Sequence, residues 1–301
     1  MSQRKEINLG ELADLIAEGP AGQEKLKKQA AAISTLQETL MLAVKRVRPY
    51  EIPVKSEDNK IKFGVIGDTQ IGSLYQRLDA LKLFYGRCAD EGVTDIFHAG
   101  DVLDGWHVYR GQEFELHPNG RSWPEQRDMF ASEVPKIDGV RTLFIVGNHD
   151  QSFKKLVGMV VGDELSRIRP DWKYIGADIG SIILKTKAGQ KFTVQLIHPG
   201  GGIKQYALSY SPQRIIEAMS GGQKPDLLCI GHYHKSFFIP SYRNIAALCV
   251  GCYQSQTPFM VQQSIAAHIG GWIVTVYLND RRKLTNRIQA EWVGFFEEQR
   301  A

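Results

Sequence analysis

The chain has 301 residues, of which 43% are hydrophobic and 23% are charged, so it can bury a large core and is not a disordered protein. Its net charge of +4 is mildly basic, which permits a phosphate-bearing partner without requiring one. The sequence has no apolar run near the roughly 20 residues that span a bilayer, and its N-terminus has no signal-peptide core. We therefore expect a cytoplasmic protein without a membrane partner.

Residues 1–60 have a helical pattern that differs from the rest of the chain. Apolar residues recur at three- and four-residue steps between Leu26 and Val47, which is the period of one helix face. A shorter helix precedes a Gly-Pro turn, so the pair is either a helix-turn-helix DNA reader or an arm for a partner protein or a second copy of the chain. Charged residues 55–60 then form a linker to a main domain that we expect at 61–301.

Strands and helices alternate at the start of the main domain. Apolar, β-branched runs predict strands at 61–68, 94–101, 141–150, 181–187, 191–200, 225–234, 245–251, 271–278 and 287–295. One helix is predicted at 74–92, and Ala188-Gly189 is typical of a hairpin turn. Early β-α-β units followed by a strand-rich half predict an α/β sandwich built on mixed β-sheets.

Polar residues follow the carboxyl ends of five predicted strands. In chain order these ends read G-D-T-Q (67–70), G-D-V-L-D (100–104), G-N-H-D (147–150), H-P-G-G (198–201) and G-H-Y-H (231–234). One such fragment is usually a turn or a structural histidine. Since open α/β sheets bind ligands where their strands end, the five together predict one site. Their oxygens and imidazoles suit divalent metals, and a bridging carboxylate would hold two ions together.

The five fragments resemble the motif series of the calcineurin-like metallophosphoesterase superfamily, which is D-x-H, G-D-x-x-D, G-N-H-D/E, a later His and G-H-x-H. The resemblance covers about residues 61–278. It implies a four-layer α/β sandwich with two mixed β-sheets flanked by helices, and a hydrolase that acts on phosphoesters. It also implies two divalent metal ions, with Mn²⁺ as the first choice and Mg²⁺, Fe²⁺ or Zn²⁺ as alternatives.

The resemblance assigns roles residue by residue. It implies that the metal ligands are Asp68, Gln70, Asp101, Asn148, His198, His232 and His234, with Asp101 as the bridge. His149 would protonate the leaving oxygen, and the Asp104 carboxylate would orient and charge that histidine.

Gln70 departs from the family pattern, because it stands where the series has a histidine. A neutral amide oxygen is a poorer ligand for zinc than an imidazole, but it is acceptable for manganese or magnesium. The outcome is a weaker first site, a shift toward Mn²⁺ or a water that fills the gap, and we expect weakened but functional binding of the first metal.

The segment 100–116 is similar to the small, exonuclease subunit of archaeal polymerase D, and the motif set resembles SbcD-type DNA nucleases and phage metallophosphoesterases. These resemblances imply phosphodiester hydrolysis in DNA. Trp106, Tyr109 and Arg110 combine aromatic rings for base stacking with a cation for phosphate, although such rings also close cores beneath loops. A small-molecule nucleotide phosphodiesterase or phosphatase, and a non-catalytic DNA-binding scaffold, are the alternatives.

Overall fold

The computed structural model describes residues 49–55, 59–202, 207–219, 224–278 and 287–296, which form two six-stranded β-sheets. The first sheet contains, in spatial order, β1 (Tyr50–Pro53), β6 (Ile179–Lys185), β7 (Lys191–Ile197), β8 (Leu227–Ile230), β10 (Ile245–Val250) and β9 (Ser236–Tyr242). The second contains β12 (Arg287–Gly294), β11 (Gly270–Tyr277), β2 (Lys60–Ile66), β3 (Asp95–Ala99), β4 (Arg141–Val146) and β5 (Trp172–Ala177).

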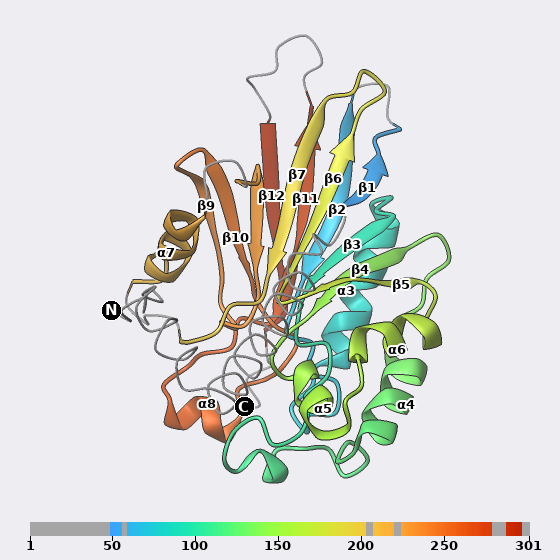
Figure 1. Ribbon diagram of the computed structural model, residues 1–301, viewed down its shortest axis with the longest axis vertical. Coiled ribbons are helices and arrows are strands. Elements are labelled where there is room, and N and C mark those ends of the chain that lie inside the picture. The colour runs from blue at the N-terminus through green and yellow to red at the C-terminus, as the bar shows by residue number, and fades with distance from the viewer. Residues whose placement is uncertain (1–48, 56–58, 203–206, 220–223, 279–286, 297–301) are drawn as a thin grey trace, which may run out of the picture. The chain divides into compact units, whose positions relative to one another are not determined.

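Helices cover the outer faces of both sheets (Figure 1). They are α3 (Leu78–Asp90), α4 (Trp123–Glu133), α5 (Asp150–Val157), α6 (Val161–Ile168) and α7 (Tyr210–Ala218). Helix α8 (Pro258–Gln262) and a 3₁₀ turn at Gln112–Phe114 belong to the connecting segments. No helix in the described part of the chain is both long and apolar enough to cross a membrane.

Alternating side chains divide the core into three layers. Phe63 and Val65 of β2 pack between the two sheets, whereas Ile66 packs toward α3 and α4, because successive residues of a strand point to opposite faces. In the same way, Leu227 of β8 lies between the sheets and Leu228 lies under α7. The protein is therefore a four-layer α/β sandwich, which confirms the predicted fold class.

Both sheets are mixed. Strands β2, β3, β4 and β5 are parallel to one another, β11 pairs antiparallel with β2, and β12 pairs antiparallel with β11. The first sheet likewise combines the antiparallel hairpin β6–β7 with the parallel pairs β7–β8 and β8–β10. Strands β3, β8 and β10 are buried along their whole length and read as apolar runs. All nine strands predicted from the sequence are present.

The remaining strands β1, β5 and β9 were not predicted. Residues 50–53 form β1, which pairs in parallel with β6, so the first sheet includes part of the expected N-terminal segment 1–60. Strand β9 contains Pro240 and lies at the edge of its sheet, the position that tolerates a residue without an N–H group. The helices expected before residue 48 lie outside the described residues.

Candidate metal centre

Asp101, which follows β3, is the central carboxylate of the site, and its side chain is buried. Its Oδ1 accepts a hydrogen bond from the backbone N–H of His149 at 2.9 Å, and its Oδ2 lies 3.0 Å from His198 Nε2. The Gln70 side-chain amide donates to Oδ2 at 3.4 Å. Groups that follow β2, β4 and β7 therefore meet at the end of β3.

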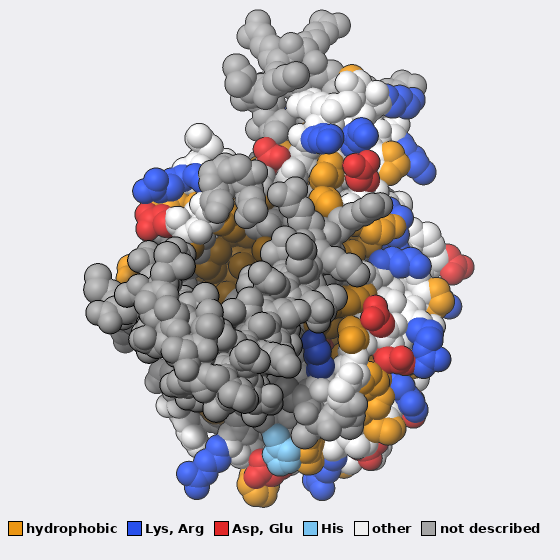
Figure 2. Space-filling model, in the orientation of Figure 1, with side chains coloured by type: hydrophobic (Ala, Val, Ile, Leu, Met, Phe, Trp, Pro, Cys, Tyr) orange, Lys and Arg blue, Asp and Glu red, His pale blue; other side chains and the backbone are white. Residues whose placement is uncertain are grey.

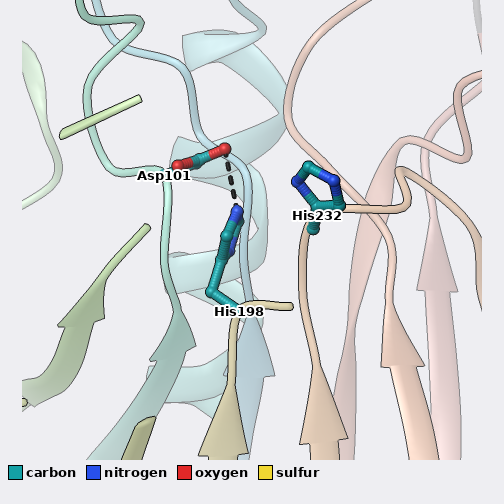
Figure 3. Close-up of side chains that lie close together, drawn as sticks. All are labelled: Asp101, His198 and His232. Atoms are coloured by element: carbon teal, nitrogen blue, oxygen red, sulfur yellow. Dashed lines mark ion pairs between the residues drawn. The ribbon is translucent and has the colours of Figure 1, made fainter. Parts of the chain in front are cut away.

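Asp101, His198 and His232 offer ligand atoms that all lie within 4.8 Å of one another. Figure 3 shows the two rings and the carboxylate at the ends of neighbouring strands. The Ala99 carbonyl lies 2.8 Å from His198 Nδ1, and since a carbonyl only accepts, Nδ1 carries the proton. This contact directs Nε2 toward Asp101, the arrangement that orients a metal-binding histidine.

Asp68 connects the G-H-Y-H motif, which follows β8, to this group. Both of its carboxylate oxygens accept from the backbone N–H of His232, at 3.0 and 2.9 Å, and Oδ1 lies 3.4 Å from His234 Nε2. Asn148 Oδ1 lies 3.2 Å from His198 Nε2. The structure thus brings all seven candidate ligands into one contiguous group.

Within this group, the side-chain oxygen of Gln70 is buried without a hydrogen-bond partner among the described residues. Its Nε2, in contrast, donates to Asp101. A buried amide oxygen without a partner costs free energy and needs an explanation. A bound cation would satisfy it, so the donor set fits the metal centre that the family implies.

Five candidate ligands have a left-handed backbone, which residues with a side chain rarely adopt. Their φ angles are 50° for Asp68, 48° for Gln70, 54° for Asp101, 75° for His232 and 52° for His234. Such conformations cost about 1–3 kcal/mol each and cluster at functional sites. They turn the chain sharply where each strand ends, so that the side chains point into one centre.

Gly147 permits the close packing around Asp101 and His198. A Cβ atom at this position would lie 2.2 Å from Asp101 Oδ1 and 2.6 Å from His198 Cδ2. A shift of either side chain would disturb the 3.0 Å contact between Asp101 Oδ2 and His198 Nε2. The glycine of G-N-H-D is therefore required by the space that the two candidate ligands occupy.

Asp150, the last residue of G-N-H-D, is a buried carboxylate that positions two loops of the site and that the sequence did not single out. Its buried carboxylate accepts from the backbone N–H groups of Val102 at 3.1 Å, Leu103 at 2.8 Å and Gly147 at 2.9 Å. It thereby ties the loop after β3 to the loop after β4. Burial, with the nearby charge of Asp101, raises the pKa of Asp150 above its usual value.

His149 is held through the backbone of Asp104. Its Nδ1 lies 2.6 Å from the Asp104 carbonyl oxygen and 3.9 Å from the carboxylate Oδ1. The carbonyl accepts the Nδ1 proton, which leaves Nε2 facing the centre, 4.0 Å from Asp101 Oδ2. The orienting atom is thus the carbonyl, and burial raises the pKa of the Asp104 carboxyl to about 7.

The electrostatics of the centre favour a cation. Burial raises the pKa of Asp101, but the charges of His198 and His149 outweigh that effect and hold it well below its usual range. Burial lowers the pKa of His198, yet Asp101 outweighs it and raises the pKa to about 9. Burial lowers the pKa of His232 to about 4, so this ring is neutral and can donate its lone pair.

Only one of the three predicted substrate residues lines the pocket beside the centre. Tyr109 does so, whereas Trp106 packs against the core under its loop and Arg110 is exposed. Lysine and arginine side chains are scattered over the described part of the face in Figure 2, so charge alone marks no nucleic-acid path there.

The family model for calcineurin-like phosphoesterases matches residues 61–236, which include the strand-end motifs from Asp68 to His234. The chain therefore belongs to the calcineurin-like phosphoesterase family. It is a hydrolase that acts on ester bonds, and the family and the Asp101–His198–His232 cluster agree on metal-dependent hydrolysis of phosphoesters.

The chain is also similar to the DNA polymerase II small subunit of two Halobacterium salinarum strains. It is 23% identical over 248 residues, which cover 70% of this chain and 47% of each relative. It thus spans about half the length of these relatives. The structure of a conserved Streptococcus pneumoniae protein, described as a predicted phosphoesterase, aligns with a TM-score of 0.35 and 13% identity, covering 77% of this chain and 98% of its own. Chaetomium thermophilum Vps29 aligns with a TM-score of 0.37 and 11% identity, covering 78% and 98%.

Replacing Gly147 with alanine tests the packing of the centre. We expect Gly147→Ala to weaken Mn²⁺ binding at least about tenfold, as measured by calorimetry, because the new Cβ displaces Asp101 or His198. Gly86→Ala is the matched control, since a Cβ there meets nothing within 4 Å and alanine favours the α3 helix. Equal Mn²⁺ affinity in both variants would contradict the requirement for glycine at 147.

Proposed function

We propose that this protein is a metal-dependent phosphodiesterase that cleaves nucleic acid, with DNA as its substrate. The observation that carries the proposal is the convergence of the seven candidate ligands around the buried Asp101 carboxylate. Family membership supports phosphoester hydrolysis. The similarity to a DNA polymerase small subunit supports nucleic acid as the substrate class.

The proposed centre is binuclear. One divalent ion would take Asp68, Gln70, Asp101 and His234, and the other would take Asp101, Asn148, His198 and His232. This division suits the geometry, since His234 lies beside Asp68 and Asn148 lies beside His198. Gln70 makes the first set richer in oxygen than the second, which favours Mn²⁺ or Mg²⁺ over zinc in that set.

His149 is the proposed general acid. A pair of divalent ions supplies Lewis-acid polarisation of the phosphoryl group and activation of water when it is bound. His149 lines the adjacent pocket and keeps its Nδ1 on the Asp104 carbonyl, so its Nε2 is free to deliver a proton. That proton would neutralise the leaving oxygen as the ester bond breaks.

Replacing His149 separates catalysis from metal binding. We expect His149→Ala to lower kcat for bis-p-nitrophenyl phosphate with Mn²⁺ by about 10²–10⁴-fold, which is the usual contribution of general acid catalysis. Calorimetry should still find two metal equivalents. His107→Ala is the control, because His107 is an exposed histidine of the neighbouring loop and should retain full activity. Full activity of His149→Ala would remove this residue from the mechanism.

A substrate panel tests the proposed substrate class. With Mn²⁺, we expect hydrolysis of single- or double-stranded DNA and a preference for the p-nitrophenyl diester over the monoester. Activity on cyclic nucleotides alone would favour a small-molecule phosphodiesterase. Absence of hydrolysis with every divalent ion would favour a DNA-binding scaffold that has kept the fold.

Changing Gln70 to histidine tests the first metal set. We expect Gln70→His to bind the first Mn²⁺ at least about tenfold more tightly, because imidazole is a stronger ligand than an amide oxygen. The backbone at this position has φ of 48°, which histidine adopts more readily than glutamine. Titration calorimetry of the two proteins measures the difference. Unchanged affinity would mean that Gln70 is not a ligand.

A further inference from the structure

A pocket of about 310 Å³ opens beside the metal centre, and its wall away from the centre has no role in the reaction chemistry described above. Asp101, His149 and His232 form the side of the pocket that belongs to the centre. The other side comes from the loop after Asp104 and from the segment 254–265. This volume is at the lower end of the range of about 300–1,000 Å³ that holds small ligands.

An aromatic pair forms part of the pocket wall. The rings of Tyr109 and Phe259 are stacked, with centroids 4.4 Å apart and planes inclined by 26°. The buried Glu115 carboxylate accepts from the Tyr109 hydroxyl and from the Phe259 backbone N–H, both at 2.7 Å. One carboxylate thus fixes two aromatic residues that lie far apart in the sequence.

The rest of the wall is uncharged. Met260 and Ile265 supply apolar surface, and Gln254 supplies an amide that is anchored by a 2.8 Å hydrogen bond to Ser73 Oγ. Apart from the groups of the centre itself, the described residues of the lining include no lysine, arginine, aspartate or glutamate. A second phosphate would find no lysine or arginine among these described residues, whereas a planar, hydrogen-bonding group would find rings and an amide.

We propose that this pocket binds the nucleoside attached to one side of the phosphodiester that is cleaved. The inference rests on the proposed phosphodiesterase function and adds a specificity site to it. Because a volume of about 310 Å³ has room for one small ligand and the described lining residues offer no lysine or arginine for the next phosphate, the preferred ester has a terminal nucleoside. Tyr109 and Phe259 supply the stacking surface, and Glu115 positions both of them.

A matched pair of substrates tests the pocket separately from the chemistry. The p-nitrophenyl esters of thymidine 5′- and 3′-monophosphate carry a nucleoside, and methyl p-nitrophenyl phosphate has the same leaving group without one. We expect the wild-type kcat/KM ratio of nucleoside to methyl substrate to exceed about 10 for one of the two thymidine esters, as one base stack predicts. Phe259→Leu should lower that ratio about tenfold, and Phe259→Tyr, which keeps the ring, should preserve it.

Val261→Ala is the control for Phe259→Leu, since Val261 lies on the same helix α8 but is exposed and outside the lining. A ratio that is the same in Phe259→Leu and Val261→Ala would overturn the proposed pocket. Hydrolysis of none of the three esters by the wild-type protein with Mn²⁺ would instead overturn the proposed function.

Glu115→Gln gives an independent test that leaves both rings in place. A glutamine amide has only one accepting oxygen, and its NH₂ group donates, so it cannot accept from the Tyr109 hydroxyl and the Phe259 N–H on separate atoms as the carboxylate does. The Tyr109–Phe259 pair should therefore loosen, and the nucleoside preference should fall. Glu113→Gln, at an exposed position two residues earlier, should leave the preference unchanged. A preserved preference in Glu115→Gln, with an unchanged thermal unfolding midpoint in both variants, would contradict the positioning role.

Discussion

The buried carboxylate of Asp101 is the group on which the organisation of the site depends. It accepts from the His149 backbone on one oxygen and faces His198 and Gln70 with the other. A buried carboxylate is costly unless donors or cations compensate it, so each element that ends near it contributes one. Strand ends from both sheets therefore meet at a point where the buried Asp101 carboxylate needs compensating charge.

Backbone strain and close packing are the cost of this convergence. Asp68, Asp101 and His232 each lie two residues after the end of a strand and adopt a left-handed conformation, which residues with a side chain normally avoid. The surrounding sandwich, buried on both faces of each sheet, holds these turns in place. Asp150 adds three hydrogen bonds that join two of the loops, so the strained segments support one another. The packing of the fold thus offsets the backbone strain that the geometry of the centre requires.

The sequence predicts those parts of the molecule that local pattern determines. The strands expected at 94–101 and 141–150 are β3 and β4, which are buried on both faces and read as apolar runs, and the polar residues after them belong to the candidate ligand group. Local pattern says nothing of contacts between distant residues. The link from Asp150 to Leu103 spans 47 positions and that from Glu115 to Phe259 spans 144. Likewise, no motif distinguishes the carbonyl of Asp104 from its carboxylate as the partner of His149.

The two halves of the site have different structural origins, which has a consequence for specificity. The candidate ligands follow core strands, whose positions are fixed by the packing of both sheets. The pocket wall comes from the loop after Asp104 and from the segment around α8, both of which lie outside the strands. Loops tolerate change better than core strands do. We therefore expect substitutions at Tyr109, Glu115 or Phe259 to alter which ester is accepted while the geometry around Asp101 stays the same.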